Sequence, residues 1–244
     1  THAAFLAKRG FTSSEDGLAG PRGLMHAAAP EADHSALTYG LGSKWLVSDN
    51  RLKPYASGVV THPVIDLGRQ VKDSSLDIDA IESVQLLVHP LVNELTGKLS
   101  PATGLEGKFS AVHCFAVGAI LGVGGPQAFS DEIVKQSEIV DLRDKCQLIV
   151  EVDRPHMTAV ARVQIGGHSK EFEVADSRGG PRRPLTTEEV RDKFKDVTTS
   201  PGLLTASDAD VWFGRLTSIG SEPSMALVAS DAAGLVPSRI TQHD

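Results

Sequence analysis

Apolar residues recur at helical spacing through the middle of the chain and alternate with polar residues in shorter stretches. Residues 105–121 carry the longest helical pattern, with apolar side chains three to five positions apart. These are Leu105, Phe109, Val112, Ala116 and Ile120. The spacing predicts one amphipathic helix over 105–121. Two polar residues, Lys108 and His113, interrupt the pattern. Either both are incidental to a helix that packs in the core, or one of them acts as an acid or base.

The remaining patterns predict a mixture of helices and strands. Gly10 and the basic residues before it indicate the end of a helix over 1–10. Pro63 marks the first turn of a helix that runs to about residue 71. Further helices are expected at 25–37, 130–136, 188–197 and 205–220, and strands at 84–89, 146–153, 159–166 and 171–176. The centre, 53–182, therefore reads as an α+β module with an antiparallel sheet and helices on one face. The helical flanks, 1–52 and 183–244, have too few apolar positions to form a core of their own. We expect them to pack against the surface of a partner.

Composition excludes several kinds of partner. Of the 244 residues, 41% are hydrophobic and only 5% aromatic, and the net charge is −7. An acidic chain with few aromatic residues is not expected to bind nucleic acid or an anionic membrane. No apolar run approaches the length of a membrane span. Two widely separated cysteines, Cys114 and Cys146, indicate no disulfide framework, so a reducing, cytoplasmic setting is expected.

Several polar residues are candidates for chemistry, and each also has a structural interpretation. Lys53 precedes a turn of small residues that includes Ser57 and Gly58, where a ligand can approach the backbone. Lys53 is thus either a carboxylate-binding group or a solvated lysine. His113 is either a general acid or base or a histidine satisfied within the core. No His or Cys spacing is typical of a metal site.

Two further observations concern the start of the chain and the other histidines. His62 and His89 both precede proline, which fits a helix cap and a strand end. Thr1 could in principle act as an N-terminal nucleophile. Such nucleophiles usually begin a strand, however, whereas Thr1 opens a helix tail.

Four separated stretches carry a resemblance to a known family. They are HAAFLAKRGFTSSEDGLAG, KPYASGVVTHPVID, VHPLVNELTGKLSPATGLEGKFSAVHCFAVGAILGVGGPQAFSD and RGGPRRPLTTEEVRDKFKDV. In this order they resemble the second half of MmgE/PrpD proteins, the family of 2-methylcitrate dehydratase, cis-aconitate decarboxylase and iminodisuccinate epimerase. The resemblance covers about residues 1–220. It implies an α+β lid domain at 53–182, with 1–52 and 183–244 belonging to an all-α domain largely missing from this chain.

The resemblance also implies roles for individual residues. The lysine of the family's lid loop matches Lys53, and the histidine nine residues later matches His62. Gly58 stands where some members, including the decarboxylase, have histidine, and His113 stands at the position of the family's tyrosine. We expect Lys53 and His113 to be catalytic, with Ser57, Gly58, His62 and Lys108 contacting substrate. For Lys108, a structural role or a contact at the rim of the site is favoured over a part in catalysis.

The implied activity is a cofactor-independent lyase that moves a proton next to a carboxylate of a small di- or tricarboxylate. Neither metal nor organic cofactor is implied. Epimerisation on the same scaffold and a non-catalytic or repurposed subunit stay open as alternatives. The partners implied are a small anionic substrate, the N-terminal half of the family as a separate or cleaved chain, and a further copy of the chain, because homodimers are common in this family.

Overall fold

The computed structural model describes residues 2–31 and 33–235, and the chain divides into two compact units, residues 1–48 and 49–244. The described residues of the first unit form short helices. They are α1 (His2–Lys8), α2 (Leu24–Ala28) and the 3₁₀ helices η1 (His34–Leu37) and η2 (Leu46–Asp49). Gly10 follows α1 in the left-handed region, with φ +84°, which confirms the predicted end of that helix. The helix expected over 25–37 is instead two short pieces, α2 and η1.

The second unit is built on one four-stranded sheet. Its strands are β1 (Ile81–Val88), β2 (Cys146–Val150), β3 (Ala159–Ile165) and β4 (His168–Val174), in the order β2-β1-β3-β4. The β1–β3 and β3–β4 pairs are antiparallel, but β1 and β2 are parallel. The expected antiparallel sheet is therefore wrong at this edge, and the sheet is mixed. The chain between β1 and β2 passes through several helices, and such a crossover returns the strand in the same direction.

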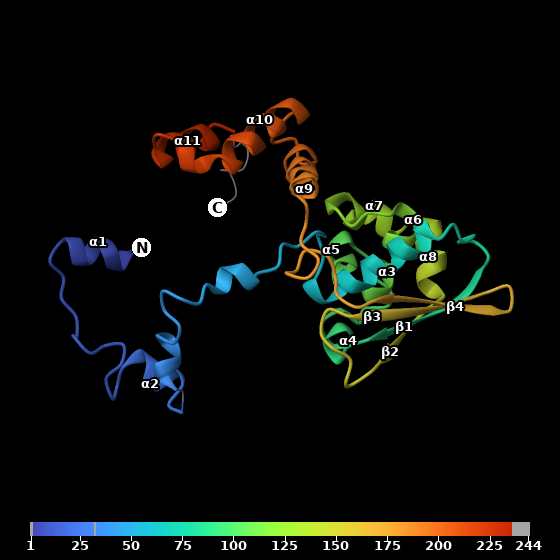
Figure 1. Cartoon of the computed structure of the whole chain (residues 1–244), viewed down its shortest axis with the longest axis horizontal. Helices are drawn as coiled ribbons and strands as arrows, with labels where there is room; N and C mark the ends of the chain where they lie inside the picture. Colours follow the sequence, from blue (N-terminus) through green and yellow to red (C-terminus); the bar gives the residue numbers. More distant parts are fainter. Residues whose placement is uncertain (1, 32, 236–244) are drawn as a thin grey trace. The chain divides into compact units, whose positions relative to one another are not determined.

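Helices lie on one face of the sheet (Figure 1). The 3₁₀ helix η3 (Val59–Thr61) and α3 (His62–Asp73) precede β1. The connection from β1 to β2 forms α4 (Pro90–Thr96), α5 (Gly104–Gly107), α6 (Ala111–Leu121), the 3₁₀ helix η4 (Pro126–Phe129), α7 (Asp131–Val134) and α8 (Ser137–Asp144). The sheet and these helices are called the sheet domain below. On the opposite face, Gln85, Arg162 and Glu171 are aligned across three strands and are exposed. One apolar face and one polar face are typical of a sheet that is covered on one side.

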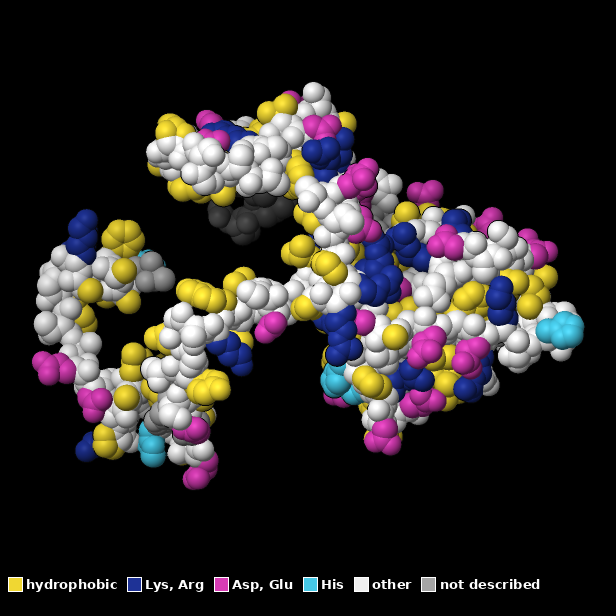
Figure 2. All heavy atoms as spheres, viewed as in Figure 1, with side chains coloured by type: hydrophobic (Ala, Val, Ile, Leu, Met, Phe, Trp, Pro, Cys, Tyr) yellow, Lys and Arg dark blue, Asp and Glu magenta, His cyan; other side chains and the backbone are white. Residues whose placement is uncertain are grey.

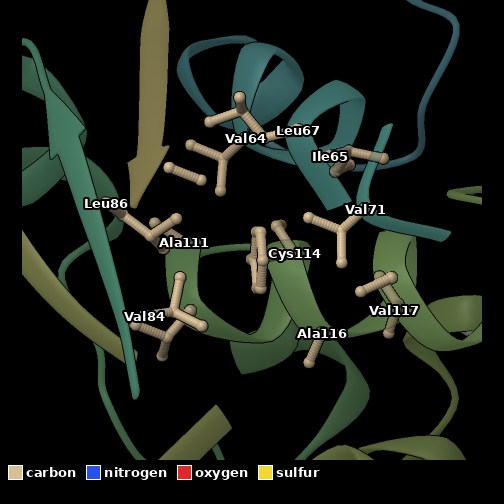
Figure 3. Packing of buried hydrophobic residues seen from close by; sticks show 14 of the residues in the cluster. Val64, Ile65, Leu67, Val71, Val84, Leu86, Ala111, Cys114, Ala116 and Val117 are labelled. Carbon is tan, nitrogen blue, oxygen red and sulfur yellow. The ribbon is translucent and has the colours of Figure 1, made fainter. Parts of the chain in front are cut away.

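The core forms where α3 and α6 meet each other and the sheet (Figure 3). Val64 and Leu67 of α3 are fully buried, as is Cys114 of α6. Val84 and Leu86 of β1 point into the same cluster. The i, i+3 and i, i+4 spacing on α3 and the alternation on β1 place these side chains on the shared face.

The helix expected over 105–121 is broken in two, as α5 and α6. Ser110 stands between them in an extended conformation, with φ −122°, and its Oγ accepts a hydrogen bond from the His113 N–H. A serine at this position ends one helix and caps the next, because it satisfies an N–H that has no partner in the first turn. Gly122 ends α6 in the left-handed conformation, with φ 72°.

The chain after the sheet is helical. It forms α9 (Thr187–Thr199), α10 (Ala206–Thr217), the 3₁₀ helix η5 (Ile219–Ser221) and α11 (Met225–Ala233). Thr186 and Glu189 form a reciprocal capping box at the start of α9. In the part of the chain that the structure describes, no helix has the length and apolar character needed to cross a membrane.

Candidate functional site

A cavity of about 860 Å³ lies between α9 and the sheet domain. Its volume is in the range of sites for small molecules. Residues 53–56 and 123–128 line it, as does the face of α9 that carries Glu189, Lys193 and Val197. Figure 2 shows Lys and Arg side chains gathered where α9 meets the sheet domain.

Five cationic side chains line this cavity: Lys53, Arg69, Lys108, Arg178 and Lys193. Of these, Arg178 is paired with Glu189. Within the described part of the chain, the other four form no ion pair with a carboxylate closer than 4.0 Å. Glu189, Asp192 and Asp196 line the same cavity, so its five cations stand against three carboxylates. The excess of positive charge favours an anionic ligand, although the protein as a whole is acidic.

Hydrogen bonds to their carbonyl oxygens hold the backbone of the two predicted lysines of the cavity. Lys193 on α9 donates from Nζ to the Lys53 carbonyl oxygen over 2.6 Å. The Gly58 N–H donates to the Lys108 carbonyl oxygen over 3.1 Å. Lys53 and Lys108 are 55 positions apart in the sequence, but the fold brings both of them to the cavity. Their predicted roles stay predictions.

A buried network of Tyr55, Asp66 and Arg178 supports one end of the cavity. The Tyr55 hydroxyl donates to Asp66 Oδ1, and the Arg178 N–H donates to Asp66 Oδ2 over 3.0 Å. The Arg178 guanidinium reaches the Tyr55 hydroxyl with Nη1, at 3.4 Å, and Glu189 Oε1 with Nη2. Burial, and then the negative charge of Asp66, raises the pKa of Tyr55, so this phenol stays neutral. Hydrogen bonding by the Thr186 N–H, together with the Arg178 charge, lowers the pKa of Glu189.

The glycine-rich turn before η4 forms another wall. The Ala56 N–H donates to the Gly124 carbonyl oxygen over 2.8 Å. A Cβ on Gly124 would lie 2.6 Å from the Tyr55 ring, so only glycine allows the turn to approach so closely. Ala128 ends this lining segment, and its carbonyl oxygen is 3.2 Å from His113 Nε2.

The structure places His113 behind this wall rather than in the cavity. Its side chain is fully buried, against the Phe129 ring, and among the described residues its Nδ1 has no hydrogen-bond partner. Burial lowers the pKa of His113 to about 4, and the Arg143 charge adds to this effect. The imidazole is therefore neutral near pH 7 and has a free lone pair. It could accept a proton, but its predicted catalytic role stays untested.

The other predicted substrate contacts, Ser57, Gly58 and His62, do not line the cavity either. Ser57 is buried, with its hydroxyl 2.8 Å from that of Thr61. His62 is buried edge-on to the Tyr55 ring, and burial lowers the pKa of His62 to about 4, with a further contribution from the Lys53 charge. These residues support the elements that carry Lys53 and Lys108, and their predicted contact with substrate stays a prediction.

Sequence reasoning missed three of the five cations: Arg69, Arg178 and Lys193. Arg178 lies in a stretch that is visibly basic, 178–183, and this could have drawn attention to it. Arg69 and Lys193 sit on helices and carry no such signal. Among the described residues, no three His, Cys, Asp or Glu side chains come together as a metal would require. Thr1, considered above as a nucleophile, lies outside the described residues.

Fold and cavity together define an α+β domain with a cavity that several cationic side chains line. The chain belongs to the MmgE/PrpD family, because the MmgE/PrpD C-terminal domain matches residues 55–210. The resemblance drawn from the sequence motifs is thereby confirmed. A comparison with curated proteins finds no match. Membership of this family suggests an enzyme of the dehydratase or lyase type.

Proposed function

We propose that this protein is the lid half of a lyase that acts on a small di- or tricarboxylate without a cofactor. The observation that carries the proposal is the set of four unpaired cations, Lys53, Arg69, Lys108 and Lys193, around one cavity. A substrate with two or three carboxylates needs several positive groups in a confined space. The family assignment supports the same reaction class.

A dehydration begins with loss of a proton from the carbon next to a carboxylate. The electron pair left on that carbon is delocalised into the carboxylate, and positive groups stabilise the resulting enolate-like state. Lys53 and Lys108 supply that charge. The electron pair then expels the hydroxyl group of the adjacent carbon, which leaves as water after it takes a proton from a general acid. In a decarboxylation the electron pair comes instead from the bond to the departing carbon dioxide, with no prior loss of a proton, and the resulting carbanion takes up a proton.

His113 is the proton-transfer residue we propose within this chain. As a neutral imidazole it suits the role of a base better than that of an acid. Because it is fully buried, and burial lowers its pKa to about 4, proton transfer requires a movement that uncovers Nδ1, the nitrogen with the lone pair, or that frees Nε2 from the Ala128 carbonyl so that the tautomer can change. The remaining acid or base groups would come from the helical half of the family.

The test is proton exchange by the complete enzyme with a panel of four- to seven-carbon di- and tricarboxylates in heavy water, followed by NMR. Deuterium incorporation together with loss of water or carbon dioxide is the expected result. Incorporation with neither loss would assign an epimerase instead. Binding without exchange or loss across the panel would contradict an enzymatic role and leave a non-catalytic subunit.

We further propose that a helical partner covers the apolar side chains of residues 2–48 and of α10 and α11. Phe5, Phe11 and Trp45 are each about two-thirds exposed, and Val211 and Met225 are similarly open. Yellow side chains are correspondingly frequent on both of these segments in Figure 2. Exposed apolar side chains in such numbers are typical of surfaces that bind another polypeptide.

Native mass spectrometry of the protein from its natural source tests this proposal. We expect an assembly that contains the helical half of the family, either as a second chain or as part of a longer one. A stable, folded 25.9 kDa monomer that is active alone would contradict it. The same spectrum reports whether further copies of this chain are present.

A further inference from the structure

Glu189 uses its two carboxylate oxygens for two different tasks. Oε2 accepts the Thr186 N–H over 2.8 Å and completes the capping box at the start of α9. Oε1 binds the Arg178 guanidinium at the edge of the cavity. The cap holds the side chain in place through one oxygen, so the contact with Arg178 can be lost without loss of the helix start.

Arg178 is the best oriented carboxylate-binding group of the cavity. Its backbone is fixed by the hydrogen bond to Asp66, and its Nη1 is directed at the Tyr55 hydroxyl. A guanidinium that is fixed in this way presents a rigid set of donors that matches a carboxylate. In the structure, the carboxylate that it holds is Glu189.

We propose that Glu189 acts as an internal competitor, which occupies Arg178 until a substrate carboxylate displaces it. This inference rests on the proposed function, since it assigns one carboxylate of the substrate to Arg178. The guanidinium keeps one carboxylate partner throughout, because the substrate carboxylate takes the place of Glu189 Oε1. Glu189 keeps its second oxygen on Thr186 throughout. The free lysines of the cavity then bind the remaining carboxylates.

The consequence is that removal of the Glu189 charge tightens binding of a polycarboxylate. Glu189→Gln keeps the capping box, which functions with either Glu or Gln, but it no longer competes for the guanidinium. Glu188 is the matched control. It is the neighbouring residue on α9, it is exposed, and it does not line the cavity. Glu188→Gln changes the net charge by the same amount without freeing Arg178.

The experiment is a citrate titration of the full 244-residue chain at low ionic strength, by calorimetry or NMR. We expect Glu189→Gln to bind citrate about two- to five-fold more tightly than the unmodified protein, the range expected for release of a partly exposed ion pair. Glu188→Gln should match the unmodified protein. Arg178→Gln should weaken citrate binding by roughly tenfold. The Arg178→Gln/Glu189→Gln double variant should bind citrate no more tightly than Arg178→Gln alone.

The outcomes separate this inference from the proposed function. If Glu189→Gln binds citrate no better than Glu188→Gln while Lys53→Ala weakens binding, the competitor role is wrong and the cavity assignment stands. If Lys53→Ala leaves citrate binding unchanged, both in the unmodified protein and in the other variants, the cavity assignment and the competitor role are both wrong. Helix content measured by circular dichroism checks that the start of α9 is intact in Glu189→Gln.

Discussion

The His113 imidazole nitrogen Nε2 lies 3.2 Å from the carbonyl oxygen of Ala128. A carbonyl oxygen only accepts, so Nε2 carries the proton and Nδ1 the lone pair. Ala128 lines the cavity, whereas His113 does not. The contact therefore ties a buried histidine to the cavity wall, and it leaves two roles to separate: proton transfer, and support of the wall.

His113→Gln separates these roles, because a glutamine amide can donate to Ala128 but cannot take up a proton. We expect the variant to fold and the turnover of the complete enzyme to fall by on the order of 10²-fold. His168→Gln, on the exposed β3–β4 hairpin, is the control and should leave turnover unchanged. Full activity of His113→Gln would show that the histidine only supports the wall.

The two buried histidines make the fold sensitive to acid. The pKa of His62 and that of His113 are each lowered to about 4 in the folded protein, against about 6.5 in the unfolded chain. Their stabilising contribution is therefore complete above pH 6.5 and is lost as the pH falls from 6.5 to 4. Each is expected to account for a loss on the order of 3 kcal/mol over this range.

Urea unfolding measured at intervals between pH 7 and pH 4 tests this expectation. The free energy of unfolding should fall steeply in the unmodified protein and less steeply in His62→Gln and His113→Gln. An equal slope in all three proteins would mean that these histidines do not titrate on unfolding.

Helices α3 and α6 approach each other through Gly68 and Gly118. A Cβ on Gly68 would lie 2.3 Å from the Phe115 carbonyl oxygen, and one on Gly118 would lie 2.6 Å from that of Ile65. Both obstacles are backbone atoms, so the helices would have to separate. Gly68→Ala should therefore destabilise the protein by about 1–3 kcal/mol, although alanine is the better helix former.

Gly214 on α10 provides the matched control, because a Cβ there has nothing within 4 Å. Gly214→Ala should stabilise its helix by up to about 1 kcal/mol. Thermal unfolding of both variants tests these predictions: the melting temperature should fall for Gly68→Ala and rise for Gly214→Ala. Stabilisation by Gly68→Ala would contradict the close packing of α3 and α6.

Local patterns were enough to predict most strands and helices, but not how the chain pairs them. The parallel pairing of β1 and β2 depends on the path of the chain through α4 to α8, which no alternation within either strand records. The break at Ser110 was hidden because Leu105 and Phe109 continue the apolar spacing of α6, although both are exposed on the other side of the break. Their exposure follows from tertiary position and not from spacing.

The candidate site was predicted only in part, because local sequence patterns do not record which residues tertiary packing brings together. Lys53 was found through motif resemblance and Lys108 as a polar residue within the helical pattern of 105–121, and the fold brings both to one cavity. Arg69 and Lys193 sit on helices about 120 positions apart and converge only through tertiary packing. Burial of His62 and His113 could not be derived either, since a histidine is compatible with core and surface alike.

Lys53 and Lys108 should each contribute to the binding of a polycarboxylate. We expect Lys53→Ala and Lys108→Ala to weaken citrate binding by about three- to tenfold each, with the effect shrinking as salt is added. Lys170→Ala is the control, since Lys170 is exposed on β4 and does not line the cavity. Equal effects of all three variants would indicate only a response to net charge.

The most direct measurement is a crystal structure of the chain with citrate. The central claim is that the cavity between α9 and the sheet domain is the carboxylate-binding half of a lyase site. It predicts citrate in this cavity, with carboxylate oxygens within hydrogen-bonding distance of Lys53 Nζ and Lys108 Nζ. Citrate bound elsewhere on the chain, with this cavity occupied by solvent alone at saturating concentration, would contradict it.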